Sequence, residues 1–426
     1  MFLSPDSSAV KALPAWRIWT MTDAMSSSCV LWQNERKTVV LLDLPRSIEE
    51  AQVPSSELRA SNDGGSPKKL RRLISALPPA SPFPTPEPKA GGSGLPAASP
   101  SAQVAELMAQ AAVESALEEI QSSYDGPWFL PRITFKPQPN NPNTPPLQSP
   151  RATATVGSPE AAPSGSLSTS PDQPRHPPSC PLAHHFPASS YPLLGSITTH
   201  RPTFLSATTP SQFSLILLDP PWPNRSAKRK RGSYTPAADL SSIRSLLSQI
   251  PVASRLAPGG YVAVWVTNAG RFVELLTNRR EGIFAEWDVE LVGEWIWLKV
   301  TTEGEPVVGV DSGWRKPWER LLIARKRGGK TERKGAVERK VIVSVPDVHS
   351  RKPNLRGLFE RELGLPEGYE ALEVFARNLT AGWWAWGDEV LLFQRRECWV
   401  EEDGEQEEGE RVQGRVRNST LCLDMV

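Results

Sequence analysis

Short apolar runs alternate with amphipathic segments along the second half of the chain, from about residue 186 to residue 393. Residues 213–218 form a continuous run, Phe-Ser-Leu-Ile-Leu-Leu, which is typical of a strand buried on both faces. Downstream of Asp239, leucine and isoleucine recur at helical spacing, and the aspartate can cap that helix. The alternation predicts an α/β fold in which helices cover a mainly parallel sheet, with ligands at the carboxyl ends of the strands.

The remaining elements of this half follow from the same two periodicities. Pro353 stands where the first residue of a helix is expected, since its missing N–H is not needed there. Further strands are predicted at residues 260–267, 294–300, 319–324, 341–345, 370–375 and 390–393, and a further helix at residues 271–279.

A smaller ordered region precedes this half. Residues 30–32 and 38–44 are β-branched and apolar and indicate a hairpin, whereas residues 102–120 are rich in alanine, glutamate and leucine and indicate a helix. Residues 128–135 are predicted to return as a strand. We therefore expect a small N-terminal α+β region, formed by residues 1–60 and residues 101–136.

Proline divides the chain into parts. Most of the 43 prolines fall between residues 78 and 192, mixed with serine, glycine and asparagine. Such sequence buries too little apolar surface to offset its chain entropy, so disordered linkers are predicted at residues 61–100 and 137–185. The two ordered regions are then expected to be loosely joined, with the main domain at residues 186–398 and an acidic, polar tail at residues 399–426.

Charge and cysteine content narrow the function only slightly. The chain has 48 basic and 47 acidic residues, so affinity for nucleic acid would have to come from local clusters. The four cysteines are far apart and lack metal-binding spacing, which predicts a reducing, intracellular compartment and no bound metal. No apolar stretch is long enough for a membrane span.

The strongest candidate for chemistry is the tetrapeptide Asp219-Pro220-Pro221-Trp222, which ends the apolar run abruptly. Two prolines exclude both helix and ladder, so the chain leaves the sheet in a rigid turn that presents a carboxylate and an indole. The Asp219 carboxylate and the Pro220 carbonyl can accept both protons of an adenine N6 amino group, while Trp222 stacks on the base. The alternative is a strand-ending turn in which Asp219 only caps and Trp222 belongs to the core.

The surrounding sequence resembles the adenine-N6 methyltransferase family named after the seventy-kilodalton subunit of the messenger-RNA adenosine methyltransferase. The resemblance spans residues 215–393 and is strongest for the methyltransferase-like-four branch, which is linked to adenosine in small nuclear RNA and to adenine in DNA. Besides the box at residues 219–222, it rests on Val262-Ala-Val-Trp-Val-Thr-Asn268, Glu294-Trp-Ile-Trp-Leu-Lys299, Lys316-Pro-Trp-Glu319, His349-Ser-Arg-Lys-Pro353 and Leu372-Glu-Val-Phe-Ala-Arg-Asn378.

The resemblance implies a Rossmann-like methyltransferase domain with permuted motif order, in which the catalytic box precedes the cofactor segment. It implies S-adenosylmethionine as cofactor, with Lys352 at the methionine carboxylate and with Arg377 and Asn378 against the ribose. A lysine beside a helix N-terminus suits an anion, although a lone lysine is more often only solvated. The other cofactor-binding residues that it implies are Asp219, Glu373, Phe375, Asp388 and Glu389.

Two of these residues carry alternatives. Asp388 stands where the family commonly has asparagine, so it keeps an acceptor and loses the amide donors. Glu373 could instead be the structural partner of a buried cation.

A basic loop follows the box within a few residues. Its candidate substrate contacts are Asn224, Lys228, Arg229, Lys230, Arg231 and Tyr234. Next to an adenine site, such cations can hold phosphates while Tyr234 contacts a neighbouring nucleotide. For residues 228–231, a nuclear-import signal and a solvated charged loop stay open as alternatives. A second basic cluster at residues 68–72 suits an import signal better, and we expect a nuclear protein.

Together these observations favour an enzyme that methylates adenine N6 in nucleic acid. RNA is the expected substrate, and the sequence leaves DNA open as the alternative. We expect it to need no obligate partner subunit, metal or membrane. The RNA target that the resemblance implies is an adenosine of the small-nuclear-RNA type, and the sequence leaves open whether that adenosine is 2′-O-methylated. The alternative function is a non-catalytic nucleic-acid-binding scaffold of the same fold, against which the intact box at residues 219–222 argues.

Overall fold

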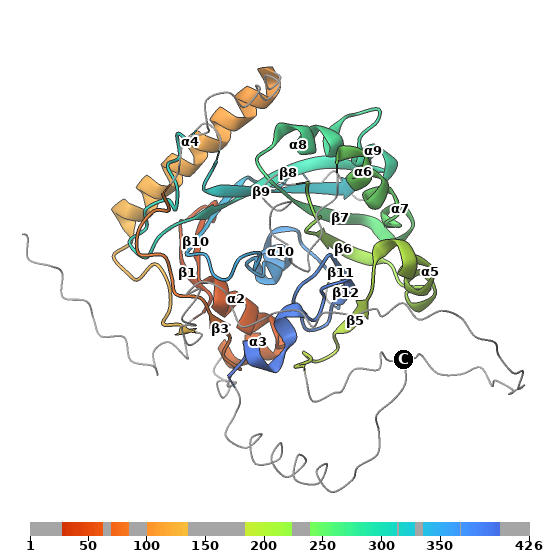
Figure 1. Ribbon diagram of the computed structural model, residues 1–426, viewed down its shortest axis with the longest axis horizontal. Coiled ribbons are helices and arrows are strands. Elements are labelled where there is room, and N and C mark those ends of the chain that lie inside the picture. The colour runs from red at the N-terminus through yellow and green to blue at the C-terminus, as the bar shows by residue number, and fades with distance from the viewer. Residues whose placement is uncertain are drawn as a thin grey trace, which may run out of the picture.

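The computed structural model describes residues 28–62, 70–84, 100–134, 184–223, 239–312, 315–328, 335–366 and 368–400. Within them, one ten-stranded sheet has the order β1-β2-β10-β8-β9-β7-β6-β11-β12-β5. Figure 1 shows this sheet curving around α10 (Arg356–Glu362), with α4 (Pro100–Ser123) along the outside of β10 and β8.

The sheet is mainly parallel, as predicted. One wing consists of β7 (Leu256–Val266), β6 (Phe213–Leu218), β11 (Ala371–Val374), β12 (Trp384–Gly387) and β5 (Tyr191–Leu194). The other contains β8 (Val289–Lys299) and β10 (Lys340–Ser344). Between the wings, β9 (Trp318–Lys326) runs antiparallel to both neighbours. Both wings therefore have their carboxyl ends at the same edge, and β9 begins at that edge.

Helices cover both faces of the sheet. They are α2 (Leu44–Ala51), α3 (Ser55–Asn62), α5 (Ile197–Ala207), α6 (Leu240–Ser248), α7 (Val252–Arg255), α8 (Gly270–Thr277) and α9 (Ile283–Glu286), besides α4 and α10. Ile243 and Leu247 of α6 are buried on the outer face, and Asp239 caps that helix by accepting from the Ser242 N–H at 2.8 Å, as predicted. On the inner face, Ile48 of α2 and Phe359 of α10 belong to one core cluster.

The N-terminal region is part of this sheet. The predicted hairpin is present as β1 (Val30–Gln33) and β2 (Val39–Leu42), and β2 pairs in parallel with β10, with Val39 opposite Val341. All four residues of β2 are buried, as in a strand with neighbours on both sides. The prediction of two loosely joined ordered regions is therefore wrong.

The predicted linker at residues 61–100 is also wrong in part. Residues 70–84 pack against the domain, and β3 (Ile74–Ser75) pairs with β4 (Ile133–Thr134). Of the strand expected at residues 128–135, only β4 forms within the described residues. The helix expected at residues 102–120 is present as α4. The predicted linker at residues 137–185 and the predicted tail at residues 399–426 lie almost entirely outside the described residues.

Two local predictions fail at the C-terminal end of the domain. Residues 390–393 form no strand but a turn and a short 3-10 helix, η3 (Leu392–Gln394), while the strand at this place is β12. The helix expected to open at Pro353 begins at Arg356, and no side chain caps it. Within the described ranges, no helix could cross a membrane, and no group of three or more His, Cys, Asp or Glu residues could hold a metal ion.

Candidate active site

Three strands of one wing and one segment of the other bring the candidate residues to one edge of the sheet. Asp219 follows β6, Arg377 follows β11 and Asp388 follows β12, each at the carboxyl end of its strand. Lys352 arrives from the other wing at the end of residues 345–352, which leave β10. The permuted order of the sequence motifs is thus compatible with a single site.

Asp219 and Lys352 form the centre of the site. The Lys352 Nζ donates to both carboxylate oxygens of Asp219, at 3.1 and 2.9 Å. Arg377 adds a second cation 3.5 Å from Oδ2. The side chains of Lys352 and Asp219 are 18% and 16% exposed, so this pair is shielded from most solvent. Two cations therefore hold the Asp219 carboxylate in one orientation.

Glu319, at the second position of β9, also lies in the candidate site, although the sequence assigned it no role. Its carboxylate lies 2.5 Å from the Nζ of Lys299 and 3.3 Å from the Nζ of Lys352. Burial opposes its charge, but these two lysines lower the pKa of Glu319 to about 2. Burial also opposes the charge of Lys352, yet Asp219 and Glu319 raise its pKa above the ordinary value. Lys352 is thus a stable ammonium shared between two carboxylates.

Glu373 has the opposite character. It lies on β11, and burial together with the negative charge of Asp219 raises its pKa to about 8. The Glu373 carboxyl is therefore mostly protonated at neutral pH, with no cation among the described residues paired to it directly. The alternative of a structural ion pair for Glu373 finds no support here.

In the turn formed by residues 219–222, the Trp222 side chain packs into the core. Its indole N–H donates to the Trp265 carbonyl at 2.8 Å, its ring lies 4.8 Å from that of Phe272, and the residue is only 7% exposed. This burial matches the alternative of a core tryptophan, and stacking on an adenine stays a prediction. The Pro220 carbonyl accepts from the Trp222 N–H at 2.8 Å, which leaves it one further lone pair.

Comparison with known proteins identifies the family of this chain. Residues 213–389 match the MT-A70 family. The N6-methyladenosine RNA methyltransferase MTA1 of Cryphonectria parasitica is 49% identical over 373 residues, which cover 87% of this chain and 94% of that protein. This chain belongs to the MT-A70 family. A protein of the same name from Pyricularia oryzae is 48% identical over 384 residues, covering 88% and 97% of the two chains. Human N(6)-adenine-specific methyltransferase METTL4 is 37% identical over 229 residues, covering 50% and 44%.

These matches confirm the predicted family, the methyltransferase fold and an adenine-N6 methyltransferase enzyme. They also refine the resemblance to the methyltransferase-like-four branch. The two MTA1 proteins match about seven-eighths of the chain, at 87% and 88%, whereas METTL4 matches half of it, at 50%. Similarity to the MTA1 proteins therefore extends beyond residues 213–389.

The residues around Arg377 form the other side of the candidate site. Arg377 donates to Glu389 at 2.9 Å and to the Ser350 carbonyl at 3.4 Å. Asp388 is among the exposed residues, but the protein around its carboxyl group removes some of its hydration. This loss of hydration and the negative charge of Glu389 raise the pKa of the Asp388 carboxyl. Asn378 is 9% exposed beside them.

The backbone forms a narrow cradle between β11 and β12. Phe375 has a positive φ of 61°, and its N–H donates to the Trp386 carbonyl at 2.7 Å. Gly387 has a φ of 154°, and a Cβ there would lie 3.1 Å from the Phe375 Cα. A side chain at position 387 would therefore intrude on this close approach.

MT-A70 methyltransferases generally depend on S-adenosylmethionine, and the donor set of this site fits that molecule. Lys352 and Arg377 offer cations to a carboxylate, while Glu389 and Asp388 offer acceptors to an ammonium group or ribose hydroxyls. In addition, the buried Oδ1 of Asn268, at the carboxyl end of β7, has no hydrogen-bond partner among the described residues. The predicted substrate contacts Asn224, Lys228, Arg229, Lys230, Arg231 and Tyr234 lie outside the described residues.

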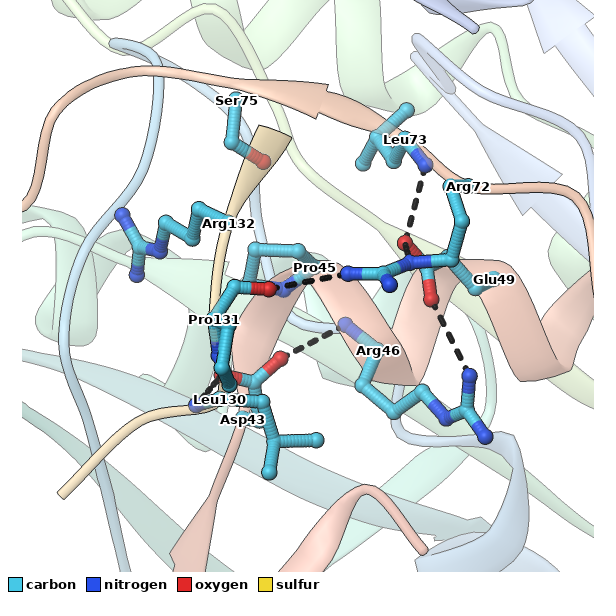
Figure 2. Close-up of a pocket in the computed structure, with 10 residues that line it drawn as sticks. All are labelled: Asp43, Pro45, Arg46, Glu49, Arg72, Leu73, Ser75, Leu130, Pro131 and Arg132. Atoms are coloured by element: carbon cyan, nitrogen blue, oxygen red, sulfur yellow. Dashed lines mark hydrogen bonds and ion pairs between the residues drawn. The ribbon is translucent and has the colours of Figure 1, made fainter. Parts of the chain in front are cut away.

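A separate small cavity lies near the same edge, between α2 and the segments around β3 and β4. Its volume is about 10 Å³, and half of its lining residues are charged. In Figure 2, Arg72 lies between Glu49 and the Pro131 carbonyl, to which it donates at 3.0 and 2.9 Å. A cavity of this size holds about one water molecule, so it is no cofactor site.

Proposed function

We propose that this protein transfers a methyl group from S-adenosylmethionine to N6 of an adenosine in RNA. The observation that carries the proposal is the placement of the Asp219 carboxylate at the carboxyl end of β6, held by Lys352 and Arg377 and followed by two prolines. The names of the two MTA1 relatives, which cover most of this chain, support RNA as the substrate.

Adenine N6 is a weak nucleophile because its lone pair is delocalised into the ring. Asp219 and the remaining lone pair of the Pro220 carbonyl can accept its two N–H protons, which favours the pyramidal nitrogen needed for attack. Bound S-adenosylmethionine supplies an electrophilic methyl group. Lys352 would hold the carboxylate of this cofactor, and Glu319 keeps Lys352 beside Asp219. No separate general base is required, since an alkylated N6 loses its extra proton readily.

The proposed target is an adenosine of the small-nuclear-RNA type, 2′-O-methylated or not, and the proposed location is the nucleus. The resemblance to the methyltransferase-like-four branch supports the target, and the basic residues 228–231 support the location. The basic cluster at residues 68–72 supports the nuclear location less, because an import signal must be accessible, whereas Leu70 is buried and Arg72 is bonded to Glu49. We propose further that the protein acts without an obligate partner subunit.

Asp219→Ala tests the chemistry. The variant should transfer methyl groups more than about a hundredfold more slowly, since the lost contact is worth ~3 kcal/mol in the transition state. Asp239→Ala is the matched control: it removes a surface helix cap away from Asp219 and should leave the rate unchanged. Activity of Asp219→Ala within about threefold of wild type would reject the assignment.

The substrate class is tested with three oligonucleotides of one sequence: RNA, RNA with a 2′-O-methylated target adenosine, and single-stranded DNA. We expect either RNA to react faster than the DNA. Faster transfer to DNA would replace RNA by DNA in the proposal. Binding of all three without transfer by the wild-type protein would favour the alternative of a non-catalytic scaffold.

A further inference from the structure

The segment that carries Lys352 into the site has no regular secondary structure. Residues 345–352 run from the end of β10 to the start of the stretch before α10, and Ser350 has a positive φ of 71°. Such a segment is not fixed by ladder hydrogen bonds, so other contacts must set the position of Lys352. Besides the ion pairs of Lys352 itself with Asp219 and Glu319, those contacts come largely from the N-terminal part of the chain.

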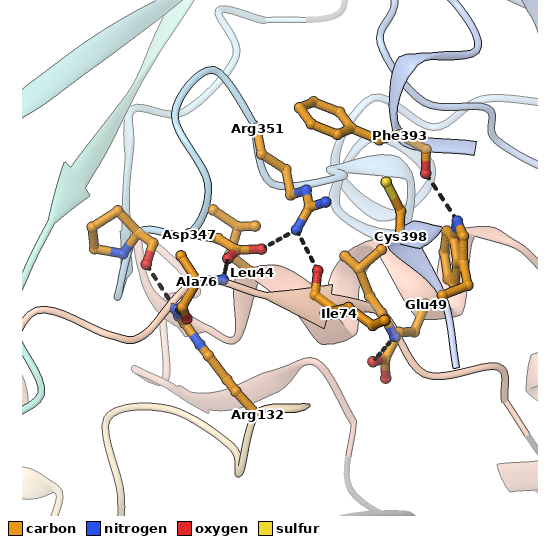
Figure 3. Close-up of polar contacts among 12 residues, drawn as sticks. Leu44, Glu49, Ile74, Ala76, Arg132, Asp347, Arg351, Phe393 and Cys398 are labelled. Carbon is orange, nitrogen blue, oxygen red and sulfur yellow. Dashed lines mark hydrogen bonds and ion pairs between the residues drawn. The ribbon is translucent and has the colours of Figure 1, made fainter. Parts of the chain in front are cut away.

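The first part of the segment is held through its backbone. Arg132, next to β4, donates to the carbonyls of Val345 and Pro346 at 2.8 and 2.9 Å. The Ala76 N–H, directly after β3, donates to the carboxylate of Asp347 at 2.7 Å. Figure 3 shows the Arg132 side chain and the backbone of Ala76 contacting the segment. Both anchors thus belong to residues 74–134.

The last part of the segment is held by the residue next to Lys352. The Arg351 guanidinium donates to the Ile74 carbonyl at 3.1 Å and to Asp347 at 2.6 Å, and it lies 4.5 Å from the centre of the Phe393 ring (Figure 3). The side chains of Arg351 and Asp347 are both 0% exposed. A fully buried ion pair adds little net stability, so this one is better explained by the position that it fixes.

We propose that the N-terminal segments around β3 and β4 are part of the active site, in that they position Lys352 for the carboxylate of the cofactor. Arg132 is the principal positioning residue, and it acts through residues 345–352. The match to the MT-A70 family covers residues 213–389, so Arg132, β3 and β4 lie outside the matched part of the chain, whereas residues 345–352 lie inside it. The inference rests on the proposed function, because it assumes that Lys352 binds S-adenosylmethionine.

Arg132→Gln tests the inference in the full chain, with calorimetric titration of S-adenosylmethionine as the main measurement. We expect cofactor binding to weaken about fivefold or more, while the affinity for an RNA oligonucleotide stays unchanged. Arg132→Lys keeps a cation that can donate to the same carbonyls, so it should recover part of the lost affinity.

Arg255→Gln is a matched control. Arg255 also donates to two backbone carbonyls, those of Leu205 and Thr208, at 2.7 and 3.4 Å, and its Nε, like that of Arg132, is buried without a partner among the described residues. It contacts α5 and not residues 345–352. If Arg255→Gln loses the same cofactor affinity as Arg132→Gln, the effect is general destabilisation and the inference is overturned.

Lys352→Ala separates this inference from the proposed function. If Lys352→Ala binds the cofactor weakly while Arg132→Gln binds like wild type, the proposed function stands and the positioning role is rejected. If Lys352→Ala itself binds like wild type, the cofactor carboxylate lies elsewhere and the proposed function must be revised. Should Arg132→Gln not fold, Arg132→Lys decides, because a lysine replaces the two-pronged guanidinium by a single ammonium. Weakened cofactor binding at an unchanged unfolding temperature supports the inference. Wild-type affinity, or a loss of affinity that only accompanies a lower unfolding temperature, overturns it.

Discussion

Replacing Glu319 by glutamine removes the negative charge that lies between two ammonium groups while keeping the shape of the side chain. In the wild type, the Glu319 carboxylate lies 2.5 Å from the Nζ of Lys299 and 3.3 Å from that of Lys352. A pKa that falls from 4.5 to about 2 corresponds to a preference for the charged form of about 3 kcal/mol. Glu319→Gln should therefore lower the free energy of unfolding by about 3 kcal/mol at neutral pH.

The sign of the pH dependence follows from the lowered pKa. A carboxyl with a depressed pKa in the folded state stabilises the protein above its unfolded pKa of about 4.5, and that stability is lost as pH falls through about 2. The difference between wild type and Glu319→Gln should thus narrow to about half near pH 3. Urea unfolding at neutral and at acidic pH measures both values.

Glu338→Gln is the matched control for this experiment. Glu338 also forms an ion pair, at 2.9 Å with Arg36, but the two side chains are 50% and 79% exposed. Its replacement should cost less than about 0.5 kcal/mol. If Glu319→Gln were no more destabilising than Glu338→Gln, the account of a shared, buried ammonium would be refuted.

Three further predictions concern the buried acid, the N-terminal region and the basic loop. Because the pKa of Glu373 is raised from 4.5 to about 8, the folded state binds an extra proton in that pH range, and wild-type stability should fall as pH rises through it. Glu373→Gln should remove most of this fall when thermal unfolding is measured at a series of pH values. An equal dependence of the unfolding temperature on pH in the two proteins would contradict this. Deleting residues 1–135 removes β2 from the edge of β10, so the remaining chain should show no cooperative unfolding by circular dichroism. Alanine at residues 228–231 should weaken RNA binding and flatten its salt dependence with cofactor affinity unchanged, whereas an unaltered salt slope would leave only the import signal or a solvated loop.

The sequence predicted those parts of the fold whose signals are local. The run at residues 213–218 and the prolines after Asp219 fix both a buried strand and its end, and β6 follows them residue for residue. The helix after Asp239 has its cap and its apolar face within ten positions, and α6 follows that pattern. Short apolar runs are ambiguous, however. Val390 and Phe393 are buried as expected, but they lie in a turn and in η3, respectively, and not in a strand.

Contacts between distant segments could not be predicted. Besides β1, β2 pairs with β10, which lies about three hundred residues further along the chain. The four residues of β2 carry no signal that would identify β10 as this partner. The role of Glu319 depends on the antiparallel direction of β9, which places the start of that strand at the functional edge. The Lys316-Pro-Trp-Glu319 segment was part of the resemblance, so the residue was visible in the sequence although its two lysine partners were not.

The identity of the methylated nucleoside tests the central claim most directly. RNA is incubated with the purified protein and S-adenosylmethionine that carries an isotope label in its methyl group, then digested to nucleosides and analysed by mass spectrometry. The account predicts label in N6-methyladenosine with the wild-type protein and its loss with Asp219→Ala. Label in a different nucleoside, or an equal amount of labelled N6-methyladenosine with Asp219→Ala, would contradict it.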